Sequence, residues 1–178
     1  MVNKAVIFDR DGVLNYPVDR IDRVTAPWTI DEFKFIPGAI EAVAMVNDKG
    51  YKTFVATNQP DWLDGNILEK DFNAINDLIR SSTPVEEICI ACMRDSVYYK
   101  PNNGMMEYLI DKYSLDISRT YMIGDRWKDI VAGYKSGLKT IFVGVNYNSP
   151  DEWNEVRPDY IVDSAFEASK LILELDND

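Results

Sequence analysis

The chain has 178 residues, of which 46% are hydrophobic and 28% charged, a balance typical of a globular domain with one sizeable core. Its net charge of −11, from 19 basic and 30 acidic residues, repels the phosphate backbone of nucleic acid and argues against a nucleic-acid partner. The sequence contains no histidine, which excludes Ser-His-Asp triads, Cys-His pairs and histidine-ligated zinc. A general acid or base must therefore be a carboxylate, Lys, Tyr or Cys.

No segment approaches the roughly 20 apolar residues of a membrane span, so no membrane partner is expected. The first residues, Met1 to Lys4, lead through a short apolar stretch to Asp9. A secretory signal needs a longer apolar region and a small-residue cleavage site. We therefore expect a cytoplasmic protein with a single domain over residues 1–178, present as a monomer or small homo-oligomer.

Apolar runs alternate with helical patterns along the chain, and glycine or proline marks several boundaries. The predicted elements, in chain order, are a strand at Lys4–Asp9, a helix from Pro37-Gly38 to Gly50, a strand at Tyr51–Thr57, a helix at Glu69–Arg80, a strand at Glu87–Met93, a helix at Asn103–Tyr113, a strand at Thr120–Gly124, a helix at Trp127–Ser136, strands at Lys139–Val145 and Asp159–Val162, and a helix at Ser164–Leu175.

This alternation of unbroken apolar strands with helices predicts an α/β fold, a three-layer Rossmann-like parallel sheet with helices on both faces. In such sheets ligands bind beyond the carboxyl ends of the strands, near the topological switch point. The long stretch from Asn15 to Phe35 is rich in Arg, Asp, Tyr and Trp, and we expect it to be a surface loop that covers the site.

Two aspartates, Asp9 and Asp11, follow the first apolar run with one residue between them. A buried, unpaired carboxylate is costly, so a pair at the end of a core strand indicates a group that neutralises them. A divalent cation such as Mg2+ would do so, and so would a phosphate chemistry that uses one carboxylate as nucleophile and the other as acid. Gly12 then lets the backbone turn sharply.

Polar and charged residues also follow the other predicted strands. The second strand ends in Thr57-Asn58, the third is followed by Lys100-Pro101, and the fourth ends in Gly124-Asp125 with Asp129 four residues on. These residues converge on one rim of the sheet if the strands are parallel. Carboxylates, a hydroxyl, an amide and an ammonium in one place suit metal-assisted phosphoryl transfer, in which catalysis is mostly positioning and charge neutralisation.

The order Asp-x-Asp-Gly, Thr-Asn, Lys-Pro and Gly-Asp-x-x-x-Asp resembles the four motifs of the haloacid dehalogenase superfamily of phosphohydrolases, over roughly Val6 to Val145. The resemblance implies that Asp9 attacks phosphorus and forms an aspartyl-phosphate. It implies that Asp11 protonates the leaving oxygen and then activates water. It also implies that Mg2+ is held by a carboxylate oxygen of Asp9, the backbone carbonyl of Asp11 and the side chain of Asp125.

The remaining motif residues receive roles from the same resemblance. Thr57 would hold the transferring phosphoryl oxygens, and Lys100 would offset the charge of nucleophile and phosphate. Asn58 and Arg126 are candidate substrate-binding residues. Asp129 would orient Lys100 or a metal-bound water.

Within the superfamily, the residues around Asp9 and the run Thr57 to Gln59 look closest to the subgroup of D-glycero-D-manno-heptose 1,7-bisphosphate and histidinol-phosphate phosphatases, which have little or no cap domain. The intervals from Asp11 to Thr57 and from Thr57 to Lys100 leave no room for a cap domain. Two features depart from that subgroup. Its zinc loop of three Cys and one His is absent, and Tyr99 stands where Arg usually precedes the Lys.

We therefore predict a Mg2+-dependent phosphoric monoester hydrolase that acts on a small phosphorylated metabolite. A sugar phosphate or bisphosphate is expected, with heptose bisphosphate as the first candidate. The alternatives are a histidinol-phosphate phosphatase, a polynucleotide 3′-phosphatase and a receiver-like phospho-aspartyl signalling module. Asp11 argues against a receiver, because such modules lack an acid two residues after the nucleophile.

Several residues keep structural alternatives. Asp125 is a candidate N-cap for the helix at Trp127, and Asp129 a candidate solvated helix position. Cys89 and Cys92 have zinc-like spacing but are better explained as buried thiols, because only two ligands exist. The arginines of the long loop, at 20 and 23, are either solvated or contacts for a second substrate phosphate.

Overall fold

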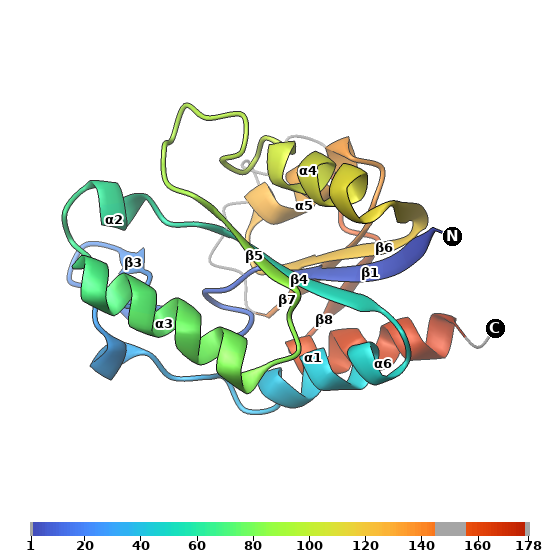
Figure 1. Ribbon diagram of the computed structural model, residues 1–178, viewed down its shortest axis with the longest axis horizontal. Coiled ribbons are helices and arrows are strands. Elements are labelled where there is room, and N and C mark those ends of the chain that lie inside the picture. Colours follow the sequence, from blue (N-terminus) through green and yellow to red (C-terminus); the bar gives the residue numbers. More distant parts are fainter. Residues whose placement is uncertain (1, 145–155, 177–178) are drawn as a thin grey trace.

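A computed structural model describes residues 2–144 and 156–176 of the chain. Its centre is a six-stranded sheet in the order β5-β4-β1-β6-β7-β8, in which every adjacent pair is parallel (Figure 1). The strands span Asn3–Phe8 (β1), Lys52–Asn58 (β4), Glu87–Ala91 (β5), Leu115–Gly124 (β6), Lys139–Val143 (β7) and Tyr160–Val162 (β8). The chain moves from β1 outward through β4 and β5 and then returns to the other side of β1, which creates a topological switch point beside β1.

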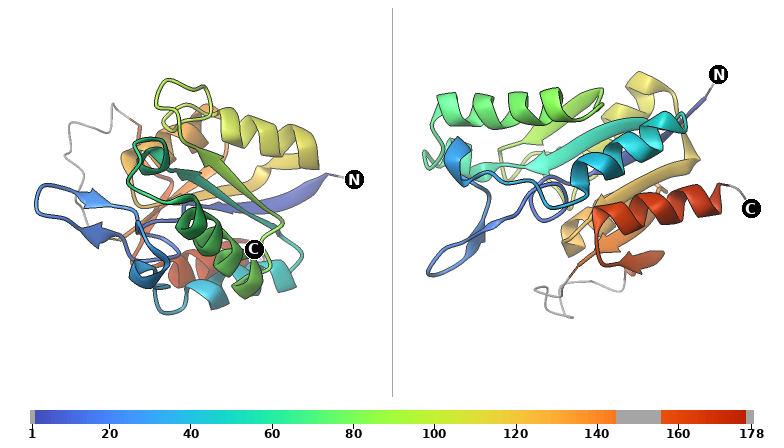
Figure 2. Two further views of the ribbon diagram at one scale, coloured as in Figure 1. Left: turned by 60° about the vertical axis from the view of Figure 1, so that its left-hand side comes forward. Right: turned by 90° about the horizontal axis from the view of Figure 1, so that it is seen from below.

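Helices cover both faces of the sheet, as the predicted three-layer fold requires. One face carries α1, α3 and α6, and the other carries α4 and α5 (Figures 1 and 2). These helices span Ala39–Asp48 (α1), Glu69–Ser82 (α3), Gly104–Tyr113 (α4), Trp127–Lys135 (α5) and Ala165–Leu175 (α6).

The alternation of side chains along β1 explains the two apolar cores. Val6 and Phe8 point into the core beneath α1, α3 and α6, whereas Ala5 and Ile7 point into the core beneath α4 and α5. All four side chains are fully buried. A strand buried on both faces must be a continuous apolar run, and it leaves only its end for polar residues.

The segment from Asn15 to Phe35 is more ordered than the predicted surface loop. It forms a small hairpin of β2 (Val18–Asp19) and β3 (Val24–Thr25), followed by a 3-10 turn, η1 (Ile30–Glu32). The hairpin projects from the edge at which the parallel strands end (Figure 2). Strands of two residues carry too little alternation for a sequence pattern to reveal them.

Other boundaries also differ from the prediction. β6 begins at Leu115 rather than Thr120, because its first residue pairs with Asn3 across an irregularity in the ladder. A short helix α2 (Pro60–Leu63) was not predicted, although Pro60 stands at its first turn, where proline is favoured. Val145, the predicted end of the fifth strand, lies outside the described residues. Among those residues, no helix is long and apolar enough to cross a membrane.

Candidate active site

The carboxyl ends of the central strands open into a pocket of about 310 Å³. The residues that line it come from four parts of the chain. They are the ends of β1 and β4 with Asp9, Asp11, Thr57 and Asn58; the loop after β5 with Tyr99 and Lys100; the start of α5 with Arg126, Trp127, Lys128 and Asp129; and the hairpin segment and α2 with Pro17, Val24, Thr25, Ala26, Pro60 and Asp61. The predicted site residues therefore meet in space, although they are separated by up to 120 positions in sequence.

Four buried charged residues, namely Asp9, Lys100, Asp125 and Asp129, form what we term the charged floor at the base of the pocket. The Lys100 Nζ lies 2.7 Å from Asp9 Oδ1 and 2.6 Å from Asp129 Oδ1, and it also donates to the backbone carbonyl of Ala56 at 2.7 Å. The side chains of Lys100 and Asp129 are each 2% exposed. All three donor positions of the ammonium are thus used, and its position is fixed.

Electrostatics at the floor oppose a bare carboxylate at Asp9. Burial and the nearby Asp129 raise the pKa of Asp9 to about 7, although Lys100 pulls it down. For Lys100 burial works against the charge, but the two carboxylates outweigh it and raise the pKa of the ammonium above its usual value. The floor therefore holds more negative charge than one lysine neutralises, and it favours a further cation.

Local structure explains why Asp129 reaches the floor. It lies on the first turn of α5, where its Oδ2 accepts a hydrogen bond from the backbone N–H of Arg126 at 3.0 Å. Gly124, the last residue of β6, passes so close that a Cβ there would collide with the Asp129 side chain. The structure thus places Asp129 as a cap of α5 and a partner of Lys100, and the alternative of a solvated helix position is wrong.

The same cluster has the chemistry of a magnesium site. Carboxylate oxygens of Asp9, Asp125 and Asp129 lie within 4.8 Å of one another, and all three residues are buried. An oxygen-only donor set of this kind suits Mg2+. Because both oxygens of Asp129 already accept from Lys100 and Arg126, Asp9 and Asp125 are the better candidates for direct ligands. Arg126, not Asp125, is the N-cap residue of α5.

Asp11 lies at the pocket wall, and its carboxylate accepts hydrogen bonds from three different side chains. Its Oδ1 accepts from Arg10 Nε at 3.2 Å and Nη2 at 3.1 Å, and from Asn15 Nδ2 at 2.9 Å. Its Oδ2 accepts from Gln59 Nε2 at 2.6 Å. Gly12, with φ of +91°, turns the chain directly afterwards, in a conformation that glycine adopts at little cost.

Thr57 and Asn58 end β4 on opposite sides of the strand. Thr57 lines the pocket, and its hydroxyl oxygen accepts from Gln59 Nε2 at 2.8 Å, which leaves the hydroxyl hydrogen able to donate to a ligand. Asn58 clamps the main chain of Lys100, because its Nδ2 donates to the Lys100 carbonyl at 2.9 Å and its Oδ1 accepts from the Lys100 N–H at 3.0 Å. Its amide therefore anchors the lysine, and the residue also lines the pocket.

The mouth of the pocket beside α5 carries cations and aromatic rings. Lys128 Nζ lies 5.7 Å from the ring centre of Tyr99 and 5.8 Å from that of Trp127, which is within cation–π range. Arg126 lines the same side. This part of the pocket is suited to a second anionic group on a ligand.

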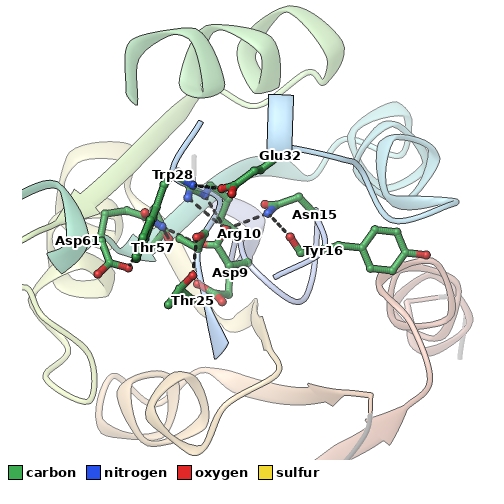
Figure 3. Close-up of polar contacts among 12 residues, drawn as sticks. Asp9, Arg10, Asn15, Tyr16, Thr25, Trp28, Glu32, Thr57 and Asp61 are labelled. Atoms are coloured by element: carbon green, nitrogen blue, oxygen red, sulfur yellow. Dashed lines mark hydrogen bonds and ion pairs between the residues drawn. The ribbon is translucent and has the colours of Figure 1, made fainter. Parts of the chain in front are cut away.

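The opposite side, which we term the outer wall, consists of residues 15–35 and α2. Arg20 forms two hydrogen bonds with Glu32, at 2.9 and 2.8 Å, and its guanidinium lies 3.8 Å from the ring centre of Trp28. Trp28 Nε1 donates to Asp61 Oδ2 at 3.2 Å, which joins the loop to α2 (Figure 3). Arg20 therefore holds the loop together, a role that the sequence did not suggest. Arg23 lies 3.7 Å from Asp61.

Sequence reasoning missed the residues that surround Asp11. Arg10, Asn15 and Gln59 are all buried, and each touches a motif residue without belonging to the motif pattern. The available signal was their position, since each lies one or two places from a motif residue or in the turn after it. The cysteines also differ from the prediction in part, because Cys89 is buried but Cys92 is only half-buried.

Comparisons with known proteins agree with this arrangement. The family model described as HAD-hydrolase-like matches residues 97–168. The D-glycero-beta-D-manno-heptose-1,7-bisphosphate 7-phosphatase of Haemophilus ducreyi is 29% identical over 158 residues, covering 79% of this chain and 82% of that protein. The enzyme of the same name from Haemophilus influenzae is 26% identical over 193 residues, covering 98% of this chain and 99% of that protein.

Among solved structures, the D,D-heptose 1,7-bisphosphate phosphatase from B. bronchiseptica, complexed with magnesium and phosphate, has a TM-score of 0.80 at 22% identity. The match covers 97% of this chain and 99% of the other chain, and at this identity the similarity shows the fold. A HAD-like phosphatase from Mesorhizobium loti has a TM-score of 0.74 at 26% identity, covering 98% and 87%. In motif order, sequence and fold the chain is thus similar to the haloacid dehalogenase-like hydrolases, heptose bisphosphate phosphatases among them.

Proposed function

We propose that the protein is a Mg2+-dependent phosphatase that hydrolyses a small phosphorylated metabolite through a phosphoryl group carried on Asp9. The observation that carries the proposal is the charged floor, in which one buried lysine holds Asp9 and Asp129 beside Asp125 at the base of an open pocket. Such an excess of buried negative charge is costly in a purely structural role. It is useful where a cation and a phosphoryl group bind together.

The reaction has two steps. A carboxylate oxygen of Asp9 forms a bond to phosphorus while the bond between phosphorus and the leaving oxygen breaks, and Asp11 gives its proton to that oxygen. In the second step Asp11 takes a proton from water as the water oxygen bonds to phosphorus, and the bond to Asp9 breaks. Orthophosphate leaves, and both carboxylates return to their initial states.

The other residues of the pocket position these groups. Thr57 donates its hydroxyl hydrogen to a phosphoryl oxygen, and the Lys100 ammonium offsets the charge on Asp9. Asp9, the backbone carbonyl of Asp11 and the Asp125 side chain would hold Mg2+, which when bound would neutralise charge on the phosphoryl oxygens. Asp129 keeps Lys100 in place.

The substrate class that we expect is a sugar bisphosphate, with heptose bisphosphate as the first candidate. The cationic mouth formed by Arg126 and Lys128 would accept the phosphate that is not hydrolysed, while the floor binds the one that is. The relatives from Haemophilus are named for this substrate. Tyr99 and Trp127 line the pocket, and their rings would give the carbon skeleton of a sugar an apolar surface to pack against.

A substrate panel tests the proposal. The purified protein would be assayed for orthophosphate release from heptose 1,7-bisphosphate, hexose mono- and bisphosphates, histidinol phosphate, a 3′-phosphorylated oligonucleotide and p-nitrophenyl phosphate, with Mg2+ and with EDTA. We expect Mg2+-dependent turnover, with the highest kcat/KM for a sugar bisphosphate. A folded protein that forms a stable phosphoryl-Asp9 without turnover would support the receiver alternative, and preference for the oligonucleotide would support the polynucleotide alternative.

A further inference from the structure

Asp11 is held very unevenly by its surroundings. Three N–H groups, two from Arg10 and one from Asn15, point at Oδ1, whereas within the described part of the chain only Gln59 contacts Oδ2 (Figure 3 shows Arg10 and Asn15). A carboxylate oxygen has two lone pairs, so Oδ1 is saturated and has no room for a proton. Oδ2 accepts one hydrogen bond and is therefore the oxygen on which a transferable proton would sit.

The main chain of Gln59 is held in place by its neighbours in the fold. Its backbone N–H donates to the Ala91 carbonyl of β5 at 2.8 Å, and Pro60 follows it at the start of α2. Its side chain is fully buried and does not line the pocket. The residue stands behind the pocket wall, so it acts on a substrate only through its neighbours.

The amide nitrogen of Gln59 has two hydrogens, and each has a partner. One points to Asp11 Oδ2 at 2.6 Å and the other to Thr57 Oγ1 at 2.8 Å. Because Thr57 is held at the end of β4, the second bond fixes the rotation of the amide plane. The first hydrogen is then aimed at Asp11, and the carboxylate cannot rotate about its last bond without losing a short hydrogen bond.

We propose that Gln59 is a positioning residue that aims the Oδ2 of Asp11 at the leaving oxygen of the substrate. The inference rests on the proposed function, in which Asp11 is the general acid. General acids contribute about 10²–10⁴-fold to a rate, and they do so only when the proton lies within hydrogen-bond reach of its acceptor. Removal of the Gln59 amide would leave Arg10 and Asn15 to pull the carboxylate by its other oxygen.

The experiment uses Gln59→Met, which nearly keeps the side-chain volume and removes both N–H donors. The Gln59 Oε1 accepts no hydrogen bond within the described residues, so its loss removes no second interaction. The kcat/KM of the Mg2+-loaded enzyme would be measured on substituted phenyl phosphates, from p-nitrophenyl phosphate to p-methoxyphenyl phosphate. A good leaving group departs without a proton, whereas a poor one needs the acid.

We expect Gln59→Met to lower kcat/KM for p-methoxyphenyl phosphate by about 30-fold or more and for p-nitrophenyl phosphate by less than about 3-fold, because only the first depends on the acid. Gln59→Glu, the second variant, keeps the shape and loses the paired donors, and it should give the same split. Asn76→Ala is the matched control, a buried amide on α3 that bonds the Phe72 carbonyl, and it should leave the ratio unchanged.

Equal losses for all leaving groups, or no loss, in a folded Gln59→Met variant would overturn the inference and leave the proposed function intact. If that variant does not fold, the same result with Gln59→Glu has the same force. Absence of Mg2+-dependent turnover of every phosphate ester by the folded wild-type protein would instead overturn the proposed function. Thermal unfolding of each variant separates these cases.

Discussion

The charged floor and the outer wall line the same pocket, but they hold their charges in opposite ways. On the floor, Lys100 and Asp129 are almost fully buried and joined by a short ion pair. On the outer wall, the Arg20 and Glu32 side chains are 21% and 32% exposed and pair beside an aromatic ring. Buried charges are costly to separate, whereas exposed pairs contribute little. We infer that the floor determines the chemistry and the wall determines which molecule reaches it.

The largest expected effect comes from the nucleophile on the floor. Asp9→Asn should lower turnover by more than about 10³-fold, because an amide is a very poor nucleophile and losses of this size follow removal of a nucleophile. Orthophosphate release under saturating Mg2+ measures it. Asp19→Asn, a carboxylate change on the exposed β2 of the wall, serves as the control and should keep the wild-type rate. Activity of Asp9→Asn above about 1% of wild type would contradict the assignment.

Substitution of Lys100 tests how much the ion pairs of the floor contribute to the stability of the protein. Lys100→Met leaves the carboxylates of Asp9 and Asp129 without their partner, and we expect it to lower the free energy of unfolding by about 3–5 kcal/mol. Urea denaturation in EDTA measures this loss. Lys112→Met removes a lysine from an exposed pair with Glu87 and should change stability much less. Equal effects of the two variants would show that the floor is not a special environment.

We expect Mg2+ to bind at the floor and not at the wall, and to stabilise the folded protein through that site. A ligand at about 100 times its Kd raises the free energy of unfolding by about 2.7 kcal/mol, so Mg2+ at that concentration should raise the unfolding midpoint clearly. Asp125→Asn should remove most of this rise. Asp61→Asn, which changes a carboxylate of the outer wall, should retain it. A midpoint that responds to Mg2+ equally in both variants would place the ion elsewhere.

The smallest expected effect on activity and stability comes from the ion pair between Arg20 and Glu32 on the outer wall. Glu32→Gln weakens the hold of Arg20, so we expect KM for a sugar bisphosphate to rise about 3- to 10-fold while kcat stays within a factor of about 2, which is the pattern of lost uniform binding. The stability change should be below about 1 kcal/mol. Steady-state kinetics on the bisphosphate and on p-nitrophenyl phosphate distinguish an effect on substrate binding from an effect on the chemical step, because the smaller ester has less contact with the wall. A lower kcat for both substrates would give the wall a part in the chemistry.

The pH dependence of that stability difference sharpens the test. Hydrogen bonds from Arg20 lower the pKa of Glu32 to about 2 from its usual 4.5. A lowered pKa means that the ion pair contributes its full stability above about pH 4.5 and loses it as the pH falls through about 2. The difference between wild type and Glu32→Gln should therefore be constant above pH 5 and shrink below it, as measured by urea unfolding at several pH values. A difference that grows on acidification would contradict the pairing.

The floor was predictable from the sequence because Asp9 and Asp125 directly follow strong apolar strands, and Lys100 and Asp129 lie in the segments that come after β5 and β6. Asp9 and Asp125 follow runs that are buried on both faces, and parallel strands bring their carboxyl ends to one edge. The strand pattern therefore predicts which residues meet, without any knowledge of side-chain contacts. The helices that cover the two faces of the sheet were predictable from the helical spacing of their apolar residues.

The wall and the surroundings of Asp11 were not predictable in this way. β2 and β3 have two residues each, and the loop that contains them is joined to α2 by the hydrogen bond from Trp28 to Asp61, which are far apart in the sequence. Likewise, nothing in the local pattern shows that Gln59 bonds Asp11 rather than solvent. These interactions depend on three-dimensional proximity, and only the folded structure reveals them.

The most direct test of the account is to identify where the phosphoryl group resides during turnover. The protein would be acid-quenched while hydrolysing an excess of p-nitrophenyl phosphate with Mg2+, digested, and analysed by mass spectrometry. The account predicts one phosphoryl group on the peptide that contains Asp9, absent from the Asp9→Asn variant. Rapid turnover with no phosphorylated peptide, or a phosphoryl group on another residue, would contradict the claim that Asp9 is the nucleophile of this pocket.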